Sequence, residues 1–300
     1  MREPIPELIF DGRYDLAEGP VWHAGYLWWV NITAGEHHRL DPVTGMHQQR
    51  DLGGNTGCAL PAKDGRWLVA RDCELNWLDW ESGSISAFCA VESGKPLNRF
   101  NDGQCDSQGR LWIGTMDQGA SGAVGALYMI EEGRPPQRML EGLTISNGMG
   151  WSSDGHKFYF TDTATNRVDV FDFNVATGTI SNRRALATFA VNEFPDGMTI
   201  DADGNLWVAL WGAWAVVCLD GQNGRELRRI PLPVSQPSSC AFGGPQLDEL
   251  FITTARVGLS AAMLAREPDA GGVFRIRPDV RGQPIQPFNS RLMVGSFQPI

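Results

Sequence analysis

The 300-residue chain lacks the features of a membrane protein and of a nucleic-acid-binding protein. Its longest uncharged apolar stretch, Leu206 to Leu219, has 14 residues with Gly212 in the middle, whereas a membrane-spanning helix needs roughly 20. We interpret this stretch as two strands and a turn. Basic residues are also few, with 25 Lys and Arg against 35 Asp and Glu, and the net charge of -10 repels phosphate backbones and anionic lipid. The sequence therefore predicts neither a nucleic-acid nor a membrane partner.

The sequence predicts neither a secretory signal nor a cysteine framework. The first twelve residues carry charges at Arg2, Glu3 and Glu7 and no apolar segment of the roughly 7 to 15 residues that a signal peptide contains, which predicts a cytoplasmic protein. The six cysteines are spread over the chain without a C-x-x-C pair, which fits neither a zinc site nor a small disulfide scaffold. We expect buried thiols, with disulfides as the alternative that spacing alone leaves open.

Long helical periodicity is missing, and a repeat takes its place. A turn containing glycine and followed by an apolar or aromatic strand recurs along the chain, as in HAGYLWWVN, KDGRWLVAR and ADGNLWVAL. PQLDELFITTA from Pro245 is a degenerate sixth copy, and a second strand-turn-strand segment follows every copy. Each unit thus contains about four short strands. The turn glycines lie 40, 44, 46 and 49 residues apart, at Gly25, Gly65, Gly109, Gly155 and Gly204.

Six units of four strands predict an all-β fold, a six-bladed β-propeller in which blades pack on their neighbours and ring closure leaves only short edges. We expect a single domain over residues 1–300. The segment at residues 7–12 precedes the first unit without a partner, so we expect it to complete the last blade and close the ring. A pair of open β-sandwiches is the alternative, but sandwiches do not require a period in the forties. Residues 289–300 fall beyond the last blade and are expected to form a loosely packed tail.

Polar residues recur just before the first strand of each unit. In a propeller this strand lines the central channel, so these residues crowd together at one mouth. Carboxylates that lie this close are tolerated when a cation neutralises them or when their pKa values shift. The plain alternative is that Asp and Asn before glycine are ordinary turn formers, although Glu18 does not fit that explanation. The ring consists of Glu18, Thr56, Asp102, Asn147, Asp196 and Ser238.

One divalent metal ion is the economical explanation of this ring. Its ligands are all oxygens, which suit a hard cation such as Ca²⁺, Mg²⁺ or Mn²⁺, and carboxylates also accept Fe²⁺ or Zn²⁺. His37 and His38 are adjacent in a predicted strand and point to opposite faces, which argues against a shared metal role. The sequence therefore predicts an oxygen-ligated metal site without identifying the metal.

Four motifs follow one another through the chain: EGP from Glu18 with Trp22 beyond it, NRFNDG from Asn98, ISNG from Ile145 and PDGM from Pro195. In this order they resemble the senescence-marker-protein/regucalcin and gluconolactonase family, and the match extends from residue 7 to about residue 288. The resemblance implies a six-bladed propeller that holds one divalent metal. It also implies an enzyme, a sugar lactonase, that opens a small-molecule sugar lactone to its aldonic acid.

The same resemblance implies roles for individual residues. The metal ligands are Glu18, Asn147 and Asp196, and Arg99 and Asn101 contact the hydroxyls or ring oxygens of the substrate, with Asn101 close to the metal. The family also has an acidic substrate contact shortly after a G-T-M motif. The loop here reads MDQGASGAVG, so Asp117 is an imperfect match. This departure leaves the sugar open among glucono-, xylono- and arabinolactone.

A mechanism follows from these parts. A metal on the carbonyl oxygen of the lactone stabilises the negative charge that appears as water attacks. We expect Asp196 to be the general base and Glu18 to anchor the metal. A hydroxide on the metal is the alternative base, because the cation lowers the pKa of a ligating carboxylate. Trp211 and Trp214 are expected to wall the pocket by stacking on the sugar.

Two other functions stay open at this point: hydrolysis of another activated ester, such as an organophosphate or aryl ester, and calcium binding by a propeller without turnover. A serine hydrolase is disfavoured, because Ser238 and Ser239 lack a G-x-S-x-G motif and an obvious His partner. A protein scaffold of the Trp-Asp repeat type is disfavoured too, because no G-H and W-D phrases recur.

Overall fold

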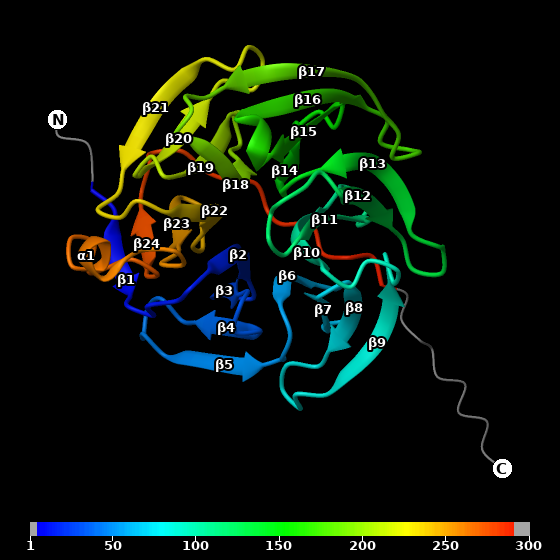
Figure 1. The fold of residues 1–300 in the computed structure, drawn as a ribbon, viewed down its shortest axis with the longest axis horizontal. Helices are drawn as coiled ribbons and strands as arrows, with labels where there is room; N and C mark the ends of the chain where they lie inside the picture. Colours follow the sequence, from blue (N-terminus) through cyan, green and yellow to red (C-terminus); the bar gives the residue numbers. More distant parts are fainter. Residues whose placement is uncertain (1–4, 291–300) are drawn as a thin grey trace.

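The computed structural model describes residues 5–290, and these form six antiparallel sheets of four strands arranged around a central axis (Figure 1). The innermost strands are β2 (Ala17–His23), β6 (Thr56–Pro61), β10 (Asn98–Cys105), β14 (Ser146–Trp151), β18 (Phe194–Ile200) and β22 (Pro237–Gly243). The second strands are β3 (Tyr26–Asn31), β7 (Trp67–Arg71), β11 (Leu111–Asp117), β15 (Lys157–Asp162), β19 (Leu206–Trp211) and β23 (Glu249–Thr254). The predicted six-bladed propeller is confirmed.

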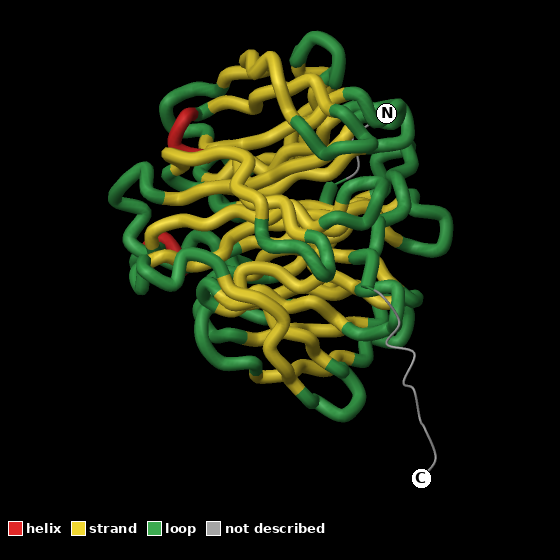
Figure 2. Tube along the Cα trace, turned by 90° about the vertical axis from the view of Figure 1, so that its right-hand side faces the viewer, coloured by secondary structure: helices red, strands yellow, loops and turns green. Residues whose placement is uncertain are grey.

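The outer half of each blade completes the sheets. The third strands are β4 (Glu36–Leu40), β8 (Glu74–Leu78), β12 (Gly125–Ile130), β16 (Arg167–Phe173), β20 (Ala215–Leu219) and β24 (Val273–Ile276). The outermost are β5 (His47–Asp51), β9 (Ile85–Ala90), β13 (Gln137–Leu143), β17 (Ile180–Thr188), β21 (Glu226–Pro231) and β1 (Glu7–Phe10). Two short helices, η1 (Thr163–Thr165) and α1 (Ala261–Leu264), lie in loops. Figure 2 shows that the loops gather at the two ends of the strands.

The ring closes as the sequence predicts. β1 pairs antiparallel with β24, with Leu8 opposite Phe274, and supplies the outermost strand of the blade whose other strands come from the end of the chain. This pairing covers the edge of β24 that would otherwise expose unpaired backbone groups. The apolar stretch from Leu206 to Leu219 forms β19 and β20 with a turn between them, as expected.

Aromatic packing explains the two adjacent histidines. Both are fully buried. The ring of His37 packs against Trp28, with 5.3 Å between centroids, whereas that of His38 stacks on Trp29 at 5.2 Å. The prediction that they point to opposite faces of their strand is therefore confirmed. The six cysteines are free, as expected, and four of them are buried.

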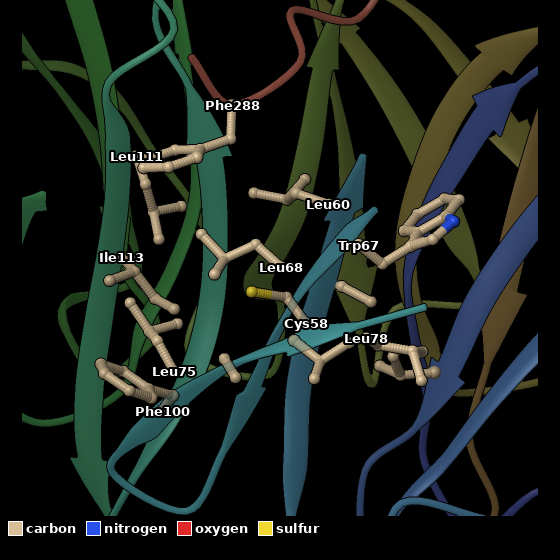
Figure 3. Packing of buried hydrophobic residues seen from close by; sticks show 14 of the residues in the cluster. Cys58, Leu60, Trp67, Leu68, Leu75, Leu78, Phe100, Leu111, Ile113 and Phe288 are labelled. Atoms are coloured by element: carbon tan, nitrogen blue, oxygen red, sulfur yellow. The ribbon is translucent and has the colours of Figure 1, made fainter. Parts of the chain in front are cut away.

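The chain after β24 runs as an extended strap, residues 279–290, across one end of the propeller (Figure 1, red). The Gly282 amide donates to the Leu247 carbonyl (2.8 Å) and the Phe288 amide to the Pro61 carbonyl (2.8 Å), so the strap joins blades on different sides of the ring. Phe288 is fully buried and packs in one cluster with Leu60 and Leu111 (Figure 3).

The start of the expected tail belongs to this strap. The Asn289 amide donates to the Gly109 carbonyl (2.9 Å), and Ser290 is buried. The expectation of loose packing therefore does not hold for these two residues, and its remainder, residues 291–300, lies outside the described residues. Within residues 5–290, no helix is long and apolar enough to cross a bilayer.

Candidate metal and substrate site

Every inner strand carries a β-bulge where the predicted ring residue lies. In β14 the pairing with β15 shifts between Ser146 and Met149, and in β18 the pairing with β19 shifts between Pro195 and Met198. The other four inner strands shift at the equivalent point. A bulge leaves its extra residue out of the ladder and redirects the side chain. Asn147 and Asp196 are thus released from strand pairing at the axis.

A glycine follows five of the six ring residues, and at two of them, Gly57 and Gly148, the neighbouring inner strand approaches too closely for a side chain. A Cβ atom on Gly148 would lie 2.4 Å from the backbone oxygen of Asp196, and one on Gly57 would lie 2.6 Å from that of Asn101. No side chain fits into such a gap without moving a backbone. The close approach explains the glycines that follow Thr56 and Asn147, whereas a Cβ atom on Gly19 would meet nothing closer than 3.8 Å.

Three carboxyl groups from three blades interact at the axis. Burial raises the pKa of Glu18 to about 8, with a further rise from Asp102. Burial also raises the pKa of Asp102 to about 6, although the Gly103 amide donates to its Oδ1 (2.7 Å) and opposes the rise. Burial, then Glu18 and Asp102, raise the pKa of Asp196 well above its usual range. This cluster favours a bound positive charge, because a cation relieves the repulsion.

Three ring side chains have a buried polar atom without a hydrogen-bond partner among the described residues. One is the Thr56 hydroxyl, and the other two, Oδ1 of Asn147 and Oδ1 of Asp196, can only accept. Glu18 is the third predicted metal ligand, and its Oε2 accepts from the Gly19 amide (2.9 Å). Within residues 5–290, no three His, Cys, Asp or Glu side chains form a metal cluster by themselves. A cation here would therefore need the amide oxygen of Asn147 beside two carboxylates, a donor set that fits a hard divalent ion.

Arg99 is the buried cation beside this acidic centre. Burial lowers its pKa to about 10, and the attraction of Glu18 and Asp196 opposes that shift. Its Nη1 donates to Oδ1 of Asn101 and to the carbonyl of Phe100 (2.6 and 2.9 Å). The Nδ2 of Asn101 donates to the carbonyl of Ser146 (2.9 Å), one residue before Asn147. Arg99 and Asn101 thus form one rigid unit that joins β10 to β14.

Thr163, the first residue of η1, is a site residue that the sequence did not indicate. It is buried, its Oγ1 accepts from Nδ2 of Asn147 (3.0 Å), and it donates to the carbonyl of Pro195 (2.8 Å). The partners lie 16 and 32 residues away in the chain, so no local motif marks Thr163.

The remaining predicted contacts lie at the mouth rather than at the axis. Asp117 ends β11, and its Oδ2 accepts from the Ser121 hydroxyl (2.6 Å) and the Ser121 amide (3.1 Å), which together lower its pKa. Trp211 ends β19, and Trp214 follows in the next turn and is 40% exposed. Contact between these three side chains and a substrate stays a prediction.

Ser238 has a structural partner in the ring. Its Oγ donates to the carbonyl of Ala17 (2.6 Å) and lies 2.9 Å from Oγ1 of Thr253, and the side chain is fully buried. Because Ala17 precedes Glu18 in β2, this bond ties the last blade to the first. No histidine is a partner of this hydroxyl among the described hydrogen bonds, which agrees with the argument against a serine nucleophile.

The fold and this centre define the chain as a six-bladed propeller with buried carboxyl and amide groups at its axis. Comparison with known families narrows the class, because the model of the SMP-30/Gluconolactonase/LRE-like region matches residues 16–256. The chain belongs to this family, as the sequence motifs indicated. Membership supports a lactonase-type function.

Individual relatives extend the match over nearly the whole chain. Regucalcin of Xenopus laevis is 34% identical over 278 residues, covering 90% of this chain and 93% of that protein. The structure of a calcium-binding protein, regucalcin, from Agrobacterium tumefaciens has a TM-score of 0.91 and 28% identity, covering 97% of this chain and 100% of that one. A luciferin-regenerating enzyme has a TM-score of 0.89 and 31% identity, with 95% and 100% coverage.

Proposed function

We propose that this protein hydrolyses a sugar lactone to the aldonic acid and requires one divalent cation held by Glu18, Asn147 and Asp196. The observation that carries the proposal is the pair of buried Oδ1 atoms, on Asn147 and Asp196, that have no donor among the described residues although they lie beside an excess of carboxyl groups. When bound, the cation would neutralise these carboxylates and polarise the lactone carbonyl. Its identity is a separate question from its position.

The surroundings of Glu18 and Asp196 support different roles for these two carboxylates. Glu18 is fixed by the Gly19 amide, which suits an anchor. Asp196 has no donor on Oδ1 among the described residues, so one oxygen of its carboxylate would face the cation and the other would take the proton from the attacking water. Burial raises the pKa of Asp196 in the metal-free protein, and a bound cation would lower it again, so the assignment of the base rests on the position of this carboxylate.

Arg99 and Asn101 form the other half of the proposed site. The guanidinium uses Nη1 to hold Asn101, which leaves Nε and Nη2 to donate to hydroxyl or ring oxygens of the sugar. Asn101 holds Arg99 in one orientation, because its Oδ1 accepts from the guanidinium while its Nδ2 donates to the carbonyl of Ser146. We propose Asp117 as a further contact at the mouth.

Metal-stripped protein assayed on glucono-, xylono- and arabinolactone with a pH indicator tests the function. Ca²⁺, Mg²⁺, Mn²⁺, Zn²⁺ and Fe²⁺ are added singly. We expect turnover of at least one lactone to return with at least one ion. Folded protein that hydrolyses no lactone with any ion would overturn the proposal.

The variant Asp196→Asn tests the assignment of the base, with Asp220→Asn, a change in an exposed turn, as the matched control. We expect Asp196→Asn to lose turnover by about 100-fold or more, the scale of general base catalysis, in protein shown to carry the metal. The control should keep wild-type turnover. Full turnover by metal-loaded Asp196→Asn would contradict the assignment.

Cation binding without turnover is the second candidate function. The description of the Agrobacterium relative as a calcium-binding protein favours it. The two candidates separate in the same experiment, because a pure binder takes up the ion and shows no hydrolysis of any lactone or aryl ester.

A further inference from the structure

A side-chain amide can face a cation only with its oxygen, because its nitrogen carries hydrogens and has no free lone pair to offer. Asn147 would therefore be a ligand in one of its two amide orientations and a repulsive neighbour in the other. Asn147 is buried, so water cannot make up for a wrong orientation. Something in the fold has to set the direction of this amide.

The side chain of Asp196 also interacts with that of Asn147, and the contact that fixes the direction of the amide is the one with the hydroxyl of Thr163, which has a single hydrogen to donate. Its single hydrogen is donated to the carbonyl of Pro195 (2.8 Å), which cannot donate in return. The Thr163 oxygen can then only accept, so the group of Asn147 that lies 3.0 Å away is the Nδ2 amide. With Nδ2 held on this side, Oδ1 is directed away from Thr163, and it is the atom that lacks a donor among the described residues.

The same residue connects the strands of two proposed ligands. Pro195 immediately precedes Asp196, so the bond to its carbonyl fixes the backbone of β18 at the ring. The backbone amide of Thr163 also donates to the carbonyl of Ile145 (3.1 Å), two residues before Asn147. One turn of chain thus holds the ring ends of both β14 and β18.

We propose that Thr163 is a positioning residue that orients the Asn147 amide with its oxygen toward the cation and so determines the affinity of the metal site. This inference rests on the metal site of the proposed function, and it does not depend on which lactone, if any, is hydrolysed. Thr163 itself touches neither the reacting atoms nor the cation in this account.

The variant Thr163→Val removes the hydroxyl and keeps the shape of the side chain. Thr161→Val is the matched control, because Thr161 is buried as well, lies two residues away in β15, and has a hydroxyl without a partner among the described residues. Binding of Ca²⁺ and of Mn²⁺ to stripped protein is measured by calorimetry. We expect Thr163→Val to weaken the binding about 10- to 100-fold, the range typical of residues that orient metal ligands. Thr161→Val should match the wild type.

Two further variants separate orientation from general stability. Thr163→Ser restores the hydroxyl and should recover affinity to within about threefold of the wild type. In the background of Asn147→Asp either carboxylate oxygen can face the cation, so adding Thr163→Val should not weaken binding further. A residue needed only for folding would weaken binding in both backgrounds.

The outcomes are distinct from those of the lactone assay. Wild-type affinity in folded Thr163→Val, or equal losses in the wild-type and the Asn147→Asp backgrounds, would overturn the proposal. If Thr163→Val does not fold, two other measurements of cation affinity carry the same test. One is the affinity of Thr163→Ser, and the other is the affinity of Asn147→Asp with and without Thr163→Ala. Metal binding that follows the predicted pattern in protein without lactonase activity would support the role of Thr163 and reject the lactonase.

Discussion

Replacing Asp102 by asparagine should stabilise the metal-free protein, and the gain should grow with pH. A carboxyl group whose pKa is raised by folding binds its proton more tightly in the native state than in the unfolded chain. Its ionisation therefore costs native stability as the pH rises from the unfolded pKa through the folded one. For Asp102 these values are 3.8 and about 6. Asparagine keeps an oxygen that accepts from the Gly103 amide and never ionises.

The size of the gain follows from the two pKa values. A rise from 3.8 to about 6 corresponds to about 3 kcal/mol at a pH of about 8, and about half of that is already present at a pH of about 5. Urea unfolding of stripped wild type and Asp102→Asn between these pH values measures the difference. We expect the advantage of the variant to increase by about 1 kcal/mol across this interval.

The control and the added metal make the test specific. Asp220→Asn should show no such growth, because hydrogen bonds lower the pKa of Asp220 in its exposed turn. Saturating metal should abolish or reverse the advantage of Asp102→Asn, since a cation attracts the ionised carboxylate. A stability difference that is constant with pH in stripped protein, or that shrinks as the pH rises, would refute the argument that ionisation of the partly buried Asp102 carboxyl group costs native stability.

Three further predictions concern the framework of the site. Gly148→Ala should lower the free energy of unfolding by about 1 to 3 kcal/mol, because its Cβ would meet the backbone oxygen of Asp196 at 2.4 Å. Gly94→Ala is the control, because the added atom meets nothing within 4 Å there. Equal stability of the two variants would contradict the close approach of the strands at Gly148. Phe288→Ala should lower the free energy of unfolding, measured in urea, by about 3 to 5 kcal/mol, because the side chain is fully buried. A loss below about 1 kcal/mol would show that the strap does not pack as described. Ser238→Ala should keep lactone turnover within about tenfold of the wild type, because its hydroxyl bonds to backbone, whereas a loss of the 10⁴-fold or greater size typical of a nucleophile would revive the serine hydrolase.

The repeat in the sequence was sufficient to predict the fold, because each unit contains the same succession of short strands and turns. A glycine turn before every second strand gave the period, and the unpaired segment around Leu8 indicated how the ring closes. The ring of polar residues could also be predicted, since equivalent points of successive blades lie close together at the axis. Residues such as Glu18 and Asp196 therefore meet whatever their separation in sequence.

Features that interrupt the repeat could not be predicted in this way. The strap contains no repeated turn phrase, and its role depends on partners such as Leu247 and Pro61 in distant blades. Thr163 could not be predicted either, because its role depends on the hydrogen bonds of its hydroxyl with Asn147 and Pro195, which are distant in the sequence. The pairing of Asp117 with Ser121 in its own loop was likewise visible only in three dimensions.

The most direct test of the account is a titration of lactone turnover against metal occupancy in one preparation of stripped protein. We expect activity to rise in proportion to bound metal and to reach its plateau at one ion per chain. We also expect Asp196→Asn to stay inactive at full occupancy. Turnover that is complete in stripped protein, or that does not follow occupancy of the site formed by Glu18, Asn147 and Asp196, would contradict these expectations.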